Sequence, residues 1–121
     1  MNVEDFQDFC MSLKGAAEKA PWTEDKYKGL ITFSVGGKWF ALLDPDNKFA
    51  DLKCEPMRVV EQIERYAGCF PAWHMNKTHW IGTRLESDVP DSVIKGMIED
   101  SYNLIVASLS RKMREELGLS D

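Results

Sequence analysis

The chain has 121 residues, of which 44% are hydrophobic and 29% charged, with a net charge of −5 and a pI near 5.0. This balance is typical of a globular domain with one core, and it excludes an intrinsically disordered chain. The acidic charge argues against a broad nucleic-acid-binding surface, which needs lysine and arginine to neutralise phosphates, although it is compatible with a small basic face.

Three features of the sequence concern the cellular compartment. The longest apolar runs, such as FALL at 40–43, are far shorter than a membrane-spanning helix. The first residues, MNVEDFQDF, carry acids where a secretory signal carries lysine or arginine. Cys10, Cys54 and Cys69 are odd in number, widely spaced and free of any CxxC pair, which predicts free thiols in a reducing compartment. We therefore expect a cytoplasmic protein with no membrane partner.

The first predicted element is a helix that Asn2 can cap and that Gly15 can end. Its apolar face consists of residues at helical spacing, namely Phe6, Phe9, Cys10 and Leu13. For residues 17–22 a short strand is an alternative to a loop.

A β region is predicted next. LITFSV at 30–35 and KWFALL at 38–43 flank Gly36-Gly37, and tight hairpin turns favour glycine because they need positive φ angles. Residues 44–47, DPDN, have the composition of a turn. Residues 49–54 alternate well enough for a third strand, which places Phe49, Asp51 and Lys53 on one side.

The second half of the chain reads as helix, loop, strand and helix. Pro56 suits the first turn of a helix that Gly68 ends, and the expected apolar stripe is Met57, Val60, Ile63 and Tyr66 or Ala67. Residues 69–79 show neither the helical nor the strand periodicity of apolar residues and are predicted to be a loop. Residues 80–85 are β-like, with Gly82 at a bulge or a close approach. A long helix is expected over 90–109, followed by a short helix that Ser110 caps. The fold class is therefore α+β, in a single domain over residues 1–121.

Residues 72–80, AWHMNKTHW, are the part of the chain richest in groups that bind or catalyse. His74 and His79 are five positions apart, whereas a zinc pair on a helix usually needs four, and a third ligand is lacking, so we predict no metal site. The sequence indicates no nucleophile with a base beside it, which leaves a catalytic cysteine or a histidine base without support.

Two interpretations of this segment stay open. The histidines can bind backbone groups in a loop or pack beside Trp73 and Trp80, in which case the segment is a structural corner. Alternatively it is a recognition surface, where an amide meets a base edge, cations meet phosphates and a tryptophan stacks. The residues with these roles are Asn76 for a base edge, Lys77 and Arg84 for phosphates, Trp73 or Trp80 for stacking, and Lys38 at the hairpin tip.

The order of several motifs along the chain resembles the MmcQ/YjbR family of small bacterial proteins. These motifs are SLKGA at 12–16, FSVGGKWFALL at 33–43, DLKCEP at 51–56, FPAWHMNKTHW at 70–80 and VPDSVIKGMIEDSYNLIVASLSRKMRE at 89–115. The match spans nearly the whole chain, and HMNKTHW is its most specific part.

The resemblance implies a CyaY-like fold, in which an antiparallel sheet packs against helices in a double-wing-like arrangement. Members are commonly labelled DNA-binding, and the family brings no enzyme activity and no cofactor. The motif positions to which it points are Lys38, Lys53, His74, Met75, Asn76, Lys77, His79 and Trp80.

The first functional hypothesis is a non-enzymatic DNA-binding or regulatory protein that acts as a monomer. Its predicted DNA-binding residues are Lys38, Lys53, His74, Asn76, Lys77, His79 and Arg84. The alternative is a protein- or small-molecule-binding module without a nucleic-acid role, with a pocket formed by Trp73, His74 and Trp80. An enzyme that uses His74 or His79 is a third option, and it needs an acid or nucleophile beside one of them.

Overall fold

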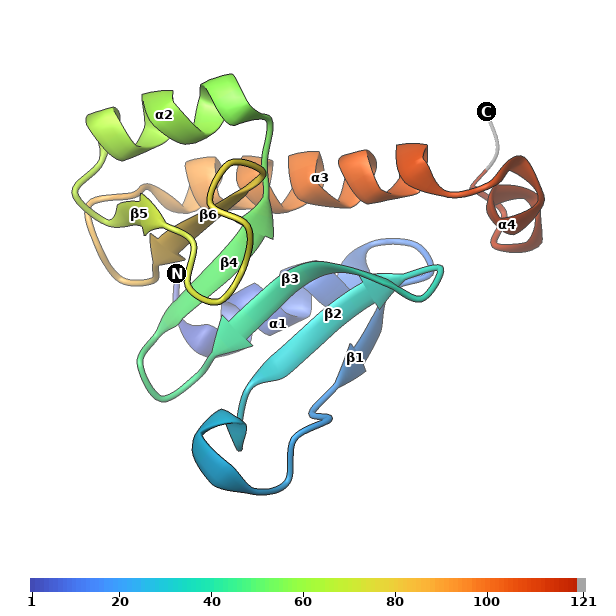
Figure 1. Cartoon of the computed structure of the whole chain (residues 1–121), viewed down its shortest axis with the longest axis horizontal. Helices are drawn as coiled ribbons and strands as arrows, with labels where there is room; N and C mark the ends of the chain where they lie inside the picture. The colour runs from blue at the N-terminus through green and yellow to red at the C-terminus, as the bar shows by residue number, and fades with distance from the viewer. Residues whose placement is uncertain (120–121) are drawn as a thin grey trace.

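A six-stranded antiparallel sheet forms the centre of the protein, in the order β1-β2-β3-β4-β6-β5 (Figure 1). The computed structural model describes residues 1–119. The strands are β1 (Ala17–Lys19), β2 (Ile31–Val35), β3 (Lys38–Asp44), β4 (Phe49–Lys53), β5 (Cys69–Pro71) and β6 (Trp80–Arg84). The helices are α1 (Val3–Ser12), the 3-10 turn η1 (Asp25–Tyr27), α2 (Pro56–Arg65), α3 (Asp91–Ser108) and α4 (Arg111–Glu116). The predicted α+β class with an antiparallel sheet is thus confirmed.

Helices α1 and α3 cover one face of the sheet (Figure 1). The main core lies between these helices and the sheet. Phe6 of α1 meets Phe33 edge-on, with ring centroids 6.1 Å apart, and Tyr102 of α3 meets Phe40 at 5.6 Å. The register of β2 and β3 shifts at Phe33, so that Phe40 is an extra residue in β3. This bulge lets both Phe40 and Ala41 join the core, although neighbouring residues of a regular strand point to opposite faces.

The opposite side of the sheet, here called the outer face, carries no α-helix from residues 1–119. Leu42, Asp51, Gly82 and Phe70 are paired in a row across β3, β4, β6 and β5 on this face. Two chain segments lie over it instead, residues 22–29 around η1 and the loop 72–79. Asp51 holds the loop through the backbone of Trp73, and the ring of Trp22 contacts that of Trp39. This face is therefore covered by loops that are rich in aromatic residues.

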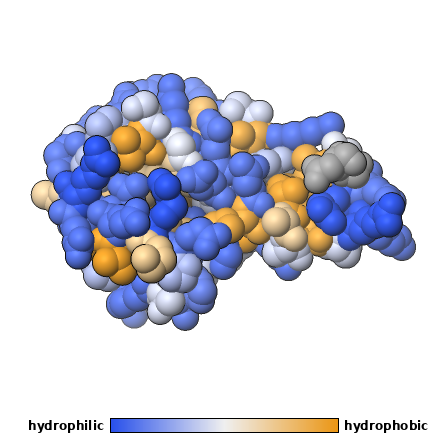
Figure 2. Space-filling view, turned by 90° about the horizontal axis from the view of Figure 1, so that it is seen from above, coloured by the Kyte–Doolittle hydropathy of each residue, from blue (hydrophilic) through white to orange (hydrophobic). Residues whose placement is uncertain are grey.

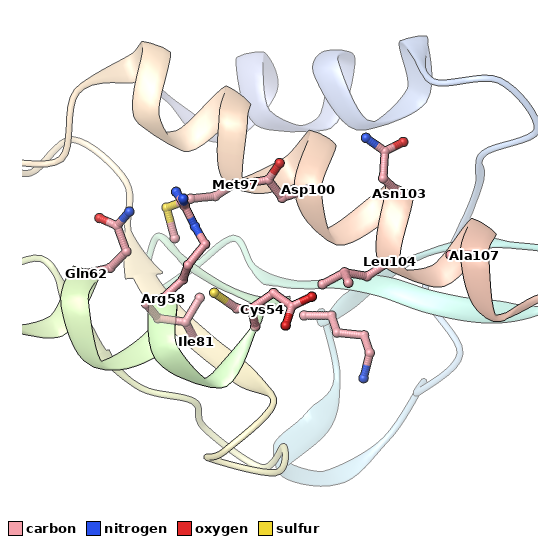
Figure 3. A pocket seen from close by; sticks show the side chains of 11 residues that line it. Cys54, Arg58, Gln62, Ile81, Met97, Asp100, Asn103, Leu104 and Ala107 are labelled. Atoms are coloured by element: carbon pink, nitrogen blue, oxygen red, sulfur yellow. The ribbon is translucent and has the colours of Figure 1, made fainter.

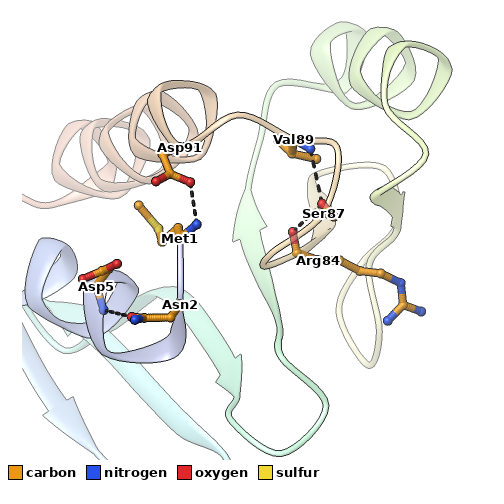
Figure 4. Close-up of polar contacts among 7 residues, drawn as sticks. All are labelled: Met1, Asn2, Asp5, Arg84, Ser87, Val89 and Asp91. Carbon is orange, nitrogen blue, oxygen red and sulfur yellow. Dashed lines mark hydrogen bonds and ion pairs between the residues drawn. The ribbon is translucent and has the colours of Figure 1, made fainter.

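Several predicted local signals are confirmed. The Asn2 side chain accepts a hydrogen bond from the amide of Asp5 at 2.8 Å and caps α1 (Figure 4). Gly36 and Gly37 have φ angles of 59° and 81° at the β2–β3 turn. A Cβ atom on Gly82 would lie 2.3 Å from the Phe70 ring, so the expected close approach is present.

Two local predictions were wrong in part. The stripe expected on α2 is right at Ile63 and Tyr66, which pack against the core, and wrong at Met57 and Val60, which are 76% and 57% exposed while Val59 is buried. The phase of α2 is set by its contact with β5 and β6 along one side only, and the apolar spacing alone does not reveal that side. The predicted loop 69–79 begins with β5, which is three residues long and therefore too short to show a period.

A side chain within the connection from β6 to α3 holds the shape of this loop through hydrogen bonds to its backbone (Figure 4). The Ser87 hydroxyl donates to the carbonyl of Arg84 at 3.0 Å and accepts from the amide of Val89 at 3.3 Å. At the other end of the chain, the amino group of Met1 lies 2.5 Å from the carboxylate of Asp91. Among the residues that the structure describes, no helix is long and apolar enough to cross a membrane.

Candidate functional site

The loop 72–79 uses most of its polar groups to hold its own shape. Oδ1 of Asn76 accepts hydrogen bonds from the amides of Thr78 and His79 at 2.9 and 3.0 Å. Nζ of Lys77 donates to the carbonyl of Ala72 at 2.6 Å. The carbonyl of His79 accepts from the amide of Cys54 at 2.9 Å and ties the loop to the end of β4. The amide oxygen and the ammonium group are thus engaged with the backbone.

Asp51 lies fully buried beneath this loop. Its Oδ1 accepts a hydrogen bond from the amide of Trp73 at 3.1 Å, and its Oδ2 is buried without a partner. Burial raises the pKa of Asp51 to about 7, although the hydrogen bond from Trp73 and the charge of Lys77 act in the opposite direction. The carboxyl group anchors the loop, and it is the one strongly shifted acid of the outer face among the described residues.

His74 is exposed and packs among aromatic rings. Its φ angle is 62°, in the left-handed region that non-glycine residues seldom adopt. Its ring lies 3.6 Å from that of Trp73 and 5.2 Å from that of Tyr27, centroid to centroid, the second contact being edge-on. His74 thereby connects the loop 72–79 to the segment around η1.

The cations predicted to meet DNA do not form one strip. Lys53 pairs with Trp80 at one end of the β4–β6 ladder, and Arg84 pairs with Phe49 at the other end. Lys38 donates to the carbonyl and hydroxyl of Ser108 at 3.3 and 3.4 Å, which ties the hairpin to the end of α3. The Arg84 guanidinium lies 5.2 Å from the Phe70 ring, and Lys53 Nζ lies 5.7 Å from the Trp80 ring. These three cations and Lys77 sit in separate environments.

The three residues of the predicted pocket do not line one cavity together, although the rings of Trp73 and His74 are in contact. Trp73 packs edge-on against Phe49 at 5.6 Å, and Trp80 is 8% exposed within β6. Of the three, His74 lines a hollow, together with Met75 of the same loop and residues of other segments. We name this hollow the aromatic box, whose walls are Trp22, Tyr27, Trp39 and His74.

A larger cavity, of about 360 Å³, lies between α2, α3 and the end of β4, and we name it the α2–α3 pocket (Figure 3). Its apolar lining is formed by Ile81, Met97, Leu104 and Ala107. Arg58 reaches from α2 toward α3, while Leu104 points from α3 toward Cys54. Clefts of this size with an apolar interior and a few polar groups are typical of small-molecule sites.

The polar groups of the α2–α3 pocket are less engaged than those of the loop. Lys53, Glu55, Arg58 and Asp100 line it, and within residues 1–119 none of the four takes part in an ion pair. Two amide side chains, Gln62 and Asn103, complete the polar part of the lining, and Oε1 of Gln62 is buried without a hydrogen-bond partner. A ligand can therefore pair with these charged groups without breaking an ion pair of the described chain, although Lys53 would have to leave the Trp80 ring, from which its Nζ lies 5.7 Å.

Cys54 is the half-buried one of the three free cysteines, and it contributes to the wall of the α2–α3 pocket. Burial raises the pKa of its thiol to about 11, and the nearby Asp100 and Glu55 act in the same direction while Arg58 opposes them. At neutral pH the group is therefore a neutral thiol, which is a weak nucleophile and acts here as part of the pocket lining.

The sequence analysis did not identify this pocket, because its members come from three separate segments. One signal was present in the sequence. Met97, Asp100, Leu104 and Ala107 follow each other at intervals of three and four residues, beside the buried stripe of α3. Among the described residues no group of three or more His, Cys, Asp or Glu side chains is arranged to hold a metal ion.

Comparisons with known proteins agree with this architecture. The family model YjbR matches residues 11–104. The uncharacterised protein YbdF of Escherichia coli O157:H7 is 32% identical over 82 residues, which cover 66% of this chain and 67% of that protein. The uncharacterised protein YjbR of Escherichia coli K12 is 26% identical over 121 residues, with 97% and 98% covered.

Solved structures give the same result. The crystal structure of Deinococcus radiodurans protein DR2400, with a DUF419 domain, has a TM-score of 0.88 and 27% identity, and the match covers 99% of this chain and 90% of that chain. A crystal structure of a protein from Pseudomonas syringae has a TM-score of 0.75 and 30% identity, with 87% and 99% covered. The family model, the curated relatives and the solved folds together establish that the chain belongs to the YjbR family.

Proposed function

We propose that the protein is a non-enzymatic binding module for a small amphipathic molecule, which the α2–α3 pocket holds. The observation that carries this proposal is the cavity of about 360 Å³, with an apolar interior and four charged side chains that form no ion pair in the described chain. Burial of an apolar ligand body against Ile81, Met97 and Leu104 supplies affinity, and the polar groups supply orientation.

The charges of the lining favour a particular class of ligand. Two cations, Lys53 and Arg58, and two anions, Glu55 and Asp100, are among the residues that line one cavity. A purely anionic or purely cationic head group would meet repulsion from two of them, whereas a zwitterionic head group can pair with both signs. The unpartnered Oε1 of Gln62 adds an acceptor for an ammonium group. The expected ligand is an apolar amino acid or a short apolar peptide.

A small ligand fits this side of the molecule better than a flat protein partner does. Figure 2 views the molecule from above and shows apolar surface in separate patches among polar residues. Protein interfaces need a broad complementary area, usually well over 1,000 Å² in total.

The experiment compares three probes that share a branched apolar body. L-leucine carries both charged groups, 4-methylpentanoate lacks the amine, and 3-methylbutylamine lacks the carboxylate. We expect leucine and leucyl-leucine to raise the thermal midpoint and to slow alkylation of Cys54 by iodoacetamide, whereas the two single-charge probes have much weaker effects. Cys10 and Cys69 are buried and provide internal controls for protein opening.

Two variants test the site itself. Ala107→Trp fills the pocket, and Glu99→Trp places the same side chain on an exposed part of α3 outside it. Binding should be lost in the first variant and kept in the second. Equal effects of all three probes, or binding unchanged by Ala107→Trp, would overturn the proposal.

DNA binding, which the family resemblance implies, stays a prediction with less support from geometry. Lys53 and Arg84 lie at opposite ends of one strand pair, and Lys38, Asn76 and Lys77 make contacts within the protein. Affinity for DNA at low salt depends on several cations that face the phosphates together.

A further inference from the structure

A second site is formed on the outer face of the sheet, where four rings from three segments stand around the aromatic box. The rings of Trp22 and Trp39 are 5.7 Å apart at an interplanar angle of 78°, and those of Trp22 and Tyr27 are 6.0 Å apart at 49°. Tyr27 and His74 meet at 5.2 Å and 80°. Successive rings thus stand at steep angles to each other, as adjacent walls of a cage do.

The base of the aromatic box is apolar and the space is small. Leu30 and Leu42, each 5% exposed, line it from the sheet side, and the cavity measures about 240 Å³. Ligand pockets for whole drug-sized molecules are usually larger than about 300 Å³, so this space suits a single compact group. The group must have a rounded shape, because walls at steep angles do not offer two parallel faces for a flat ring.

The chemistry of the lining selects the charge of this group. Among the residues whose side chains the structure describes, no lysine, arginine, aspartate or glutamate lines the box. Aromatic faces are electron-rich and attract cations, most strongly those of tryptophan. An ordinary ammonium group would lose hydrogen bonds to water here without gaining acceptors, whereas a fully methylated ammonium has no N–H groups to satisfy.

Two further observations concern a cation at this position. Nζ of Lys26 lies 5.1 Å from the centroid of the Tyr27 ring without lining the box, so this ring attracts a cation, while the lysine charge opposes a second cation nearby. The net charge of −5 favours the approach of cations to the molecule as a whole.

From these contacts we infer that the aromatic box binds a quaternary ammonium group, such as the trimethylammonium head of a choline-like or betaine-like molecule. This site is distinct from the α2–α3 pocket, since the two share no lining residue. The inference stands or fails independently of the proposed function.

The decisive measurement is a titration followed by tryptophan fluorescence and by amide NMR shifts. The probes are choline and 3,3-dimethylbutan-1-ol, which has the same shape but a carbon in place of the charged nitrogen. We expect choline to bind saturably and the neutral alcohol to bind at least tenfold more weakly, since only the charged probe gains the cation–π attraction. Equal binding of the two probes would overturn the inference, because it would show a merely apolar hollow.

Variants locate the binding. Trp39→Leu keeps an apolar side chain at a position that is 36% exposed but removes one wall, and choline affinity should fall at least tenfold. Trp80→Phe alters a tryptophan that does not line the box and should leave the affinity within twofold. Circular dichroism and the unfolding midpoint verify that each variant is folded. Choline binding that survives Trp39→Leu, or that vanishes with Ala107→Trp in the other pocket, contradicts the assignment.

Discussion

The loop 72–79 and the α2–α3 pocket differ in whether their polar side chains are free to bind a ligand. The loop carries the densest set of polar and aromatic residues in the chain, yet Asn76, Lys77 and the backbone of Trp73 are hydrogen-bonded within the protein. The pocket has no conspicuous motif, yet its charged groups form no ion pairs in the described chain. A group's capacity to bind a ligand depends on what it already binds, and a sequence shows the group without its partners.

This difference leads to an ordered set of stability effects. Substitutions of the polar groups that hold the loop should change the free energy of unfolding. Matched substitutions in the lining of the pocket should leave it nearly unchanged, since exposed charges outside a network contribute little.

The largest effect is expected from Asp51→Asn, and it depends on pH. The pKa of Asp51 is raised in the folded state to about 7 from 3.8, so the folded protein binds this proton more tightly than the unfolded chain does. The contribution of this group to stability is therefore greatest below about pH 4, falls as the pH rises to 7, and is constant above that. One pKa unit corresponds to about 1.4 kcal/mol, so the loss is up to about 4 kcal/mol.

Asparagine keeps an oxygen for the amide of Trp73 and carries no charge at any pH. The variant should therefore lack this part of the pH dependence and be more stable than the original protein at pH 8. Urea unfolding at a series of pH values from 4 to 8 measures the difference. Parallel curves for the two proteins would show that Asp51 titrates normally.

The second effect compares two asparagines. Asn76→Ala removes the acceptor of two backbone amides and should destabilise the protein by about 1–2 kcal/mol. Asn103→Ala removes an exposed amide from the pocket lining and should stay within about 0.5 kcal/mol of the original. Denaturant unfolding of both variants at one pH is sufficient. A similar loss in both would break the distinction between the two regions.

The third effect compares two cations. Lys77→Met removes the charged donor to the carbonyl of Ala72, and we expect a loss of about 1 kcal/mol. Arg58→Met removes a charge without an ion pair in the described chain and should change stability by less than about 0.5 kcal/mol while weakening ligand binding in the pocket. Unfolding curves and the leucine titration together separate the two roles.

The smallest effect is expected for DNA. A gel shift with mixed-sequence duplex at low salt should show little retardation of the DNA, and the triple variant Lys38→Ala, Lys77→Ala, Arg84→Ala should behave as the original protein does. Strong retardation that the triple variant abolishes would instead support the DNA-binding prediction, because cations from separate places would then act together.

The sequence predicted elements whose signals are local. Asn2 as a cap and Gly36-Gly37 as a turn need only their near neighbours along the chain, and both were correct. The predicted face of α2 was right at Ile63 but wrong in its first turns, because packing against the rest of the fold buries Val59 and leaves Val60 exposed. Spacing along the sequence does not encode distances in three dimensions. It therefore could not reveal the hydrogen bonds of Asn76 and Lys77. Nor could it show that one cavity brings together Cys54, Arg58 and Asp100.

The two outer strands of the sheet have a consequence for how the molecule behaves at high concentration. An open strand edge is a template on which a second chain can add its own strand, and such addition leads to aggregation. Here β1 and β5 form the edges, each only three residues long, and β5 ends in Pro71, which has no N–H group to offer. The fold thus gives an incoming strand few hydrogen-bonding groups, and this protects the protein against edge-to-edge polymerisation.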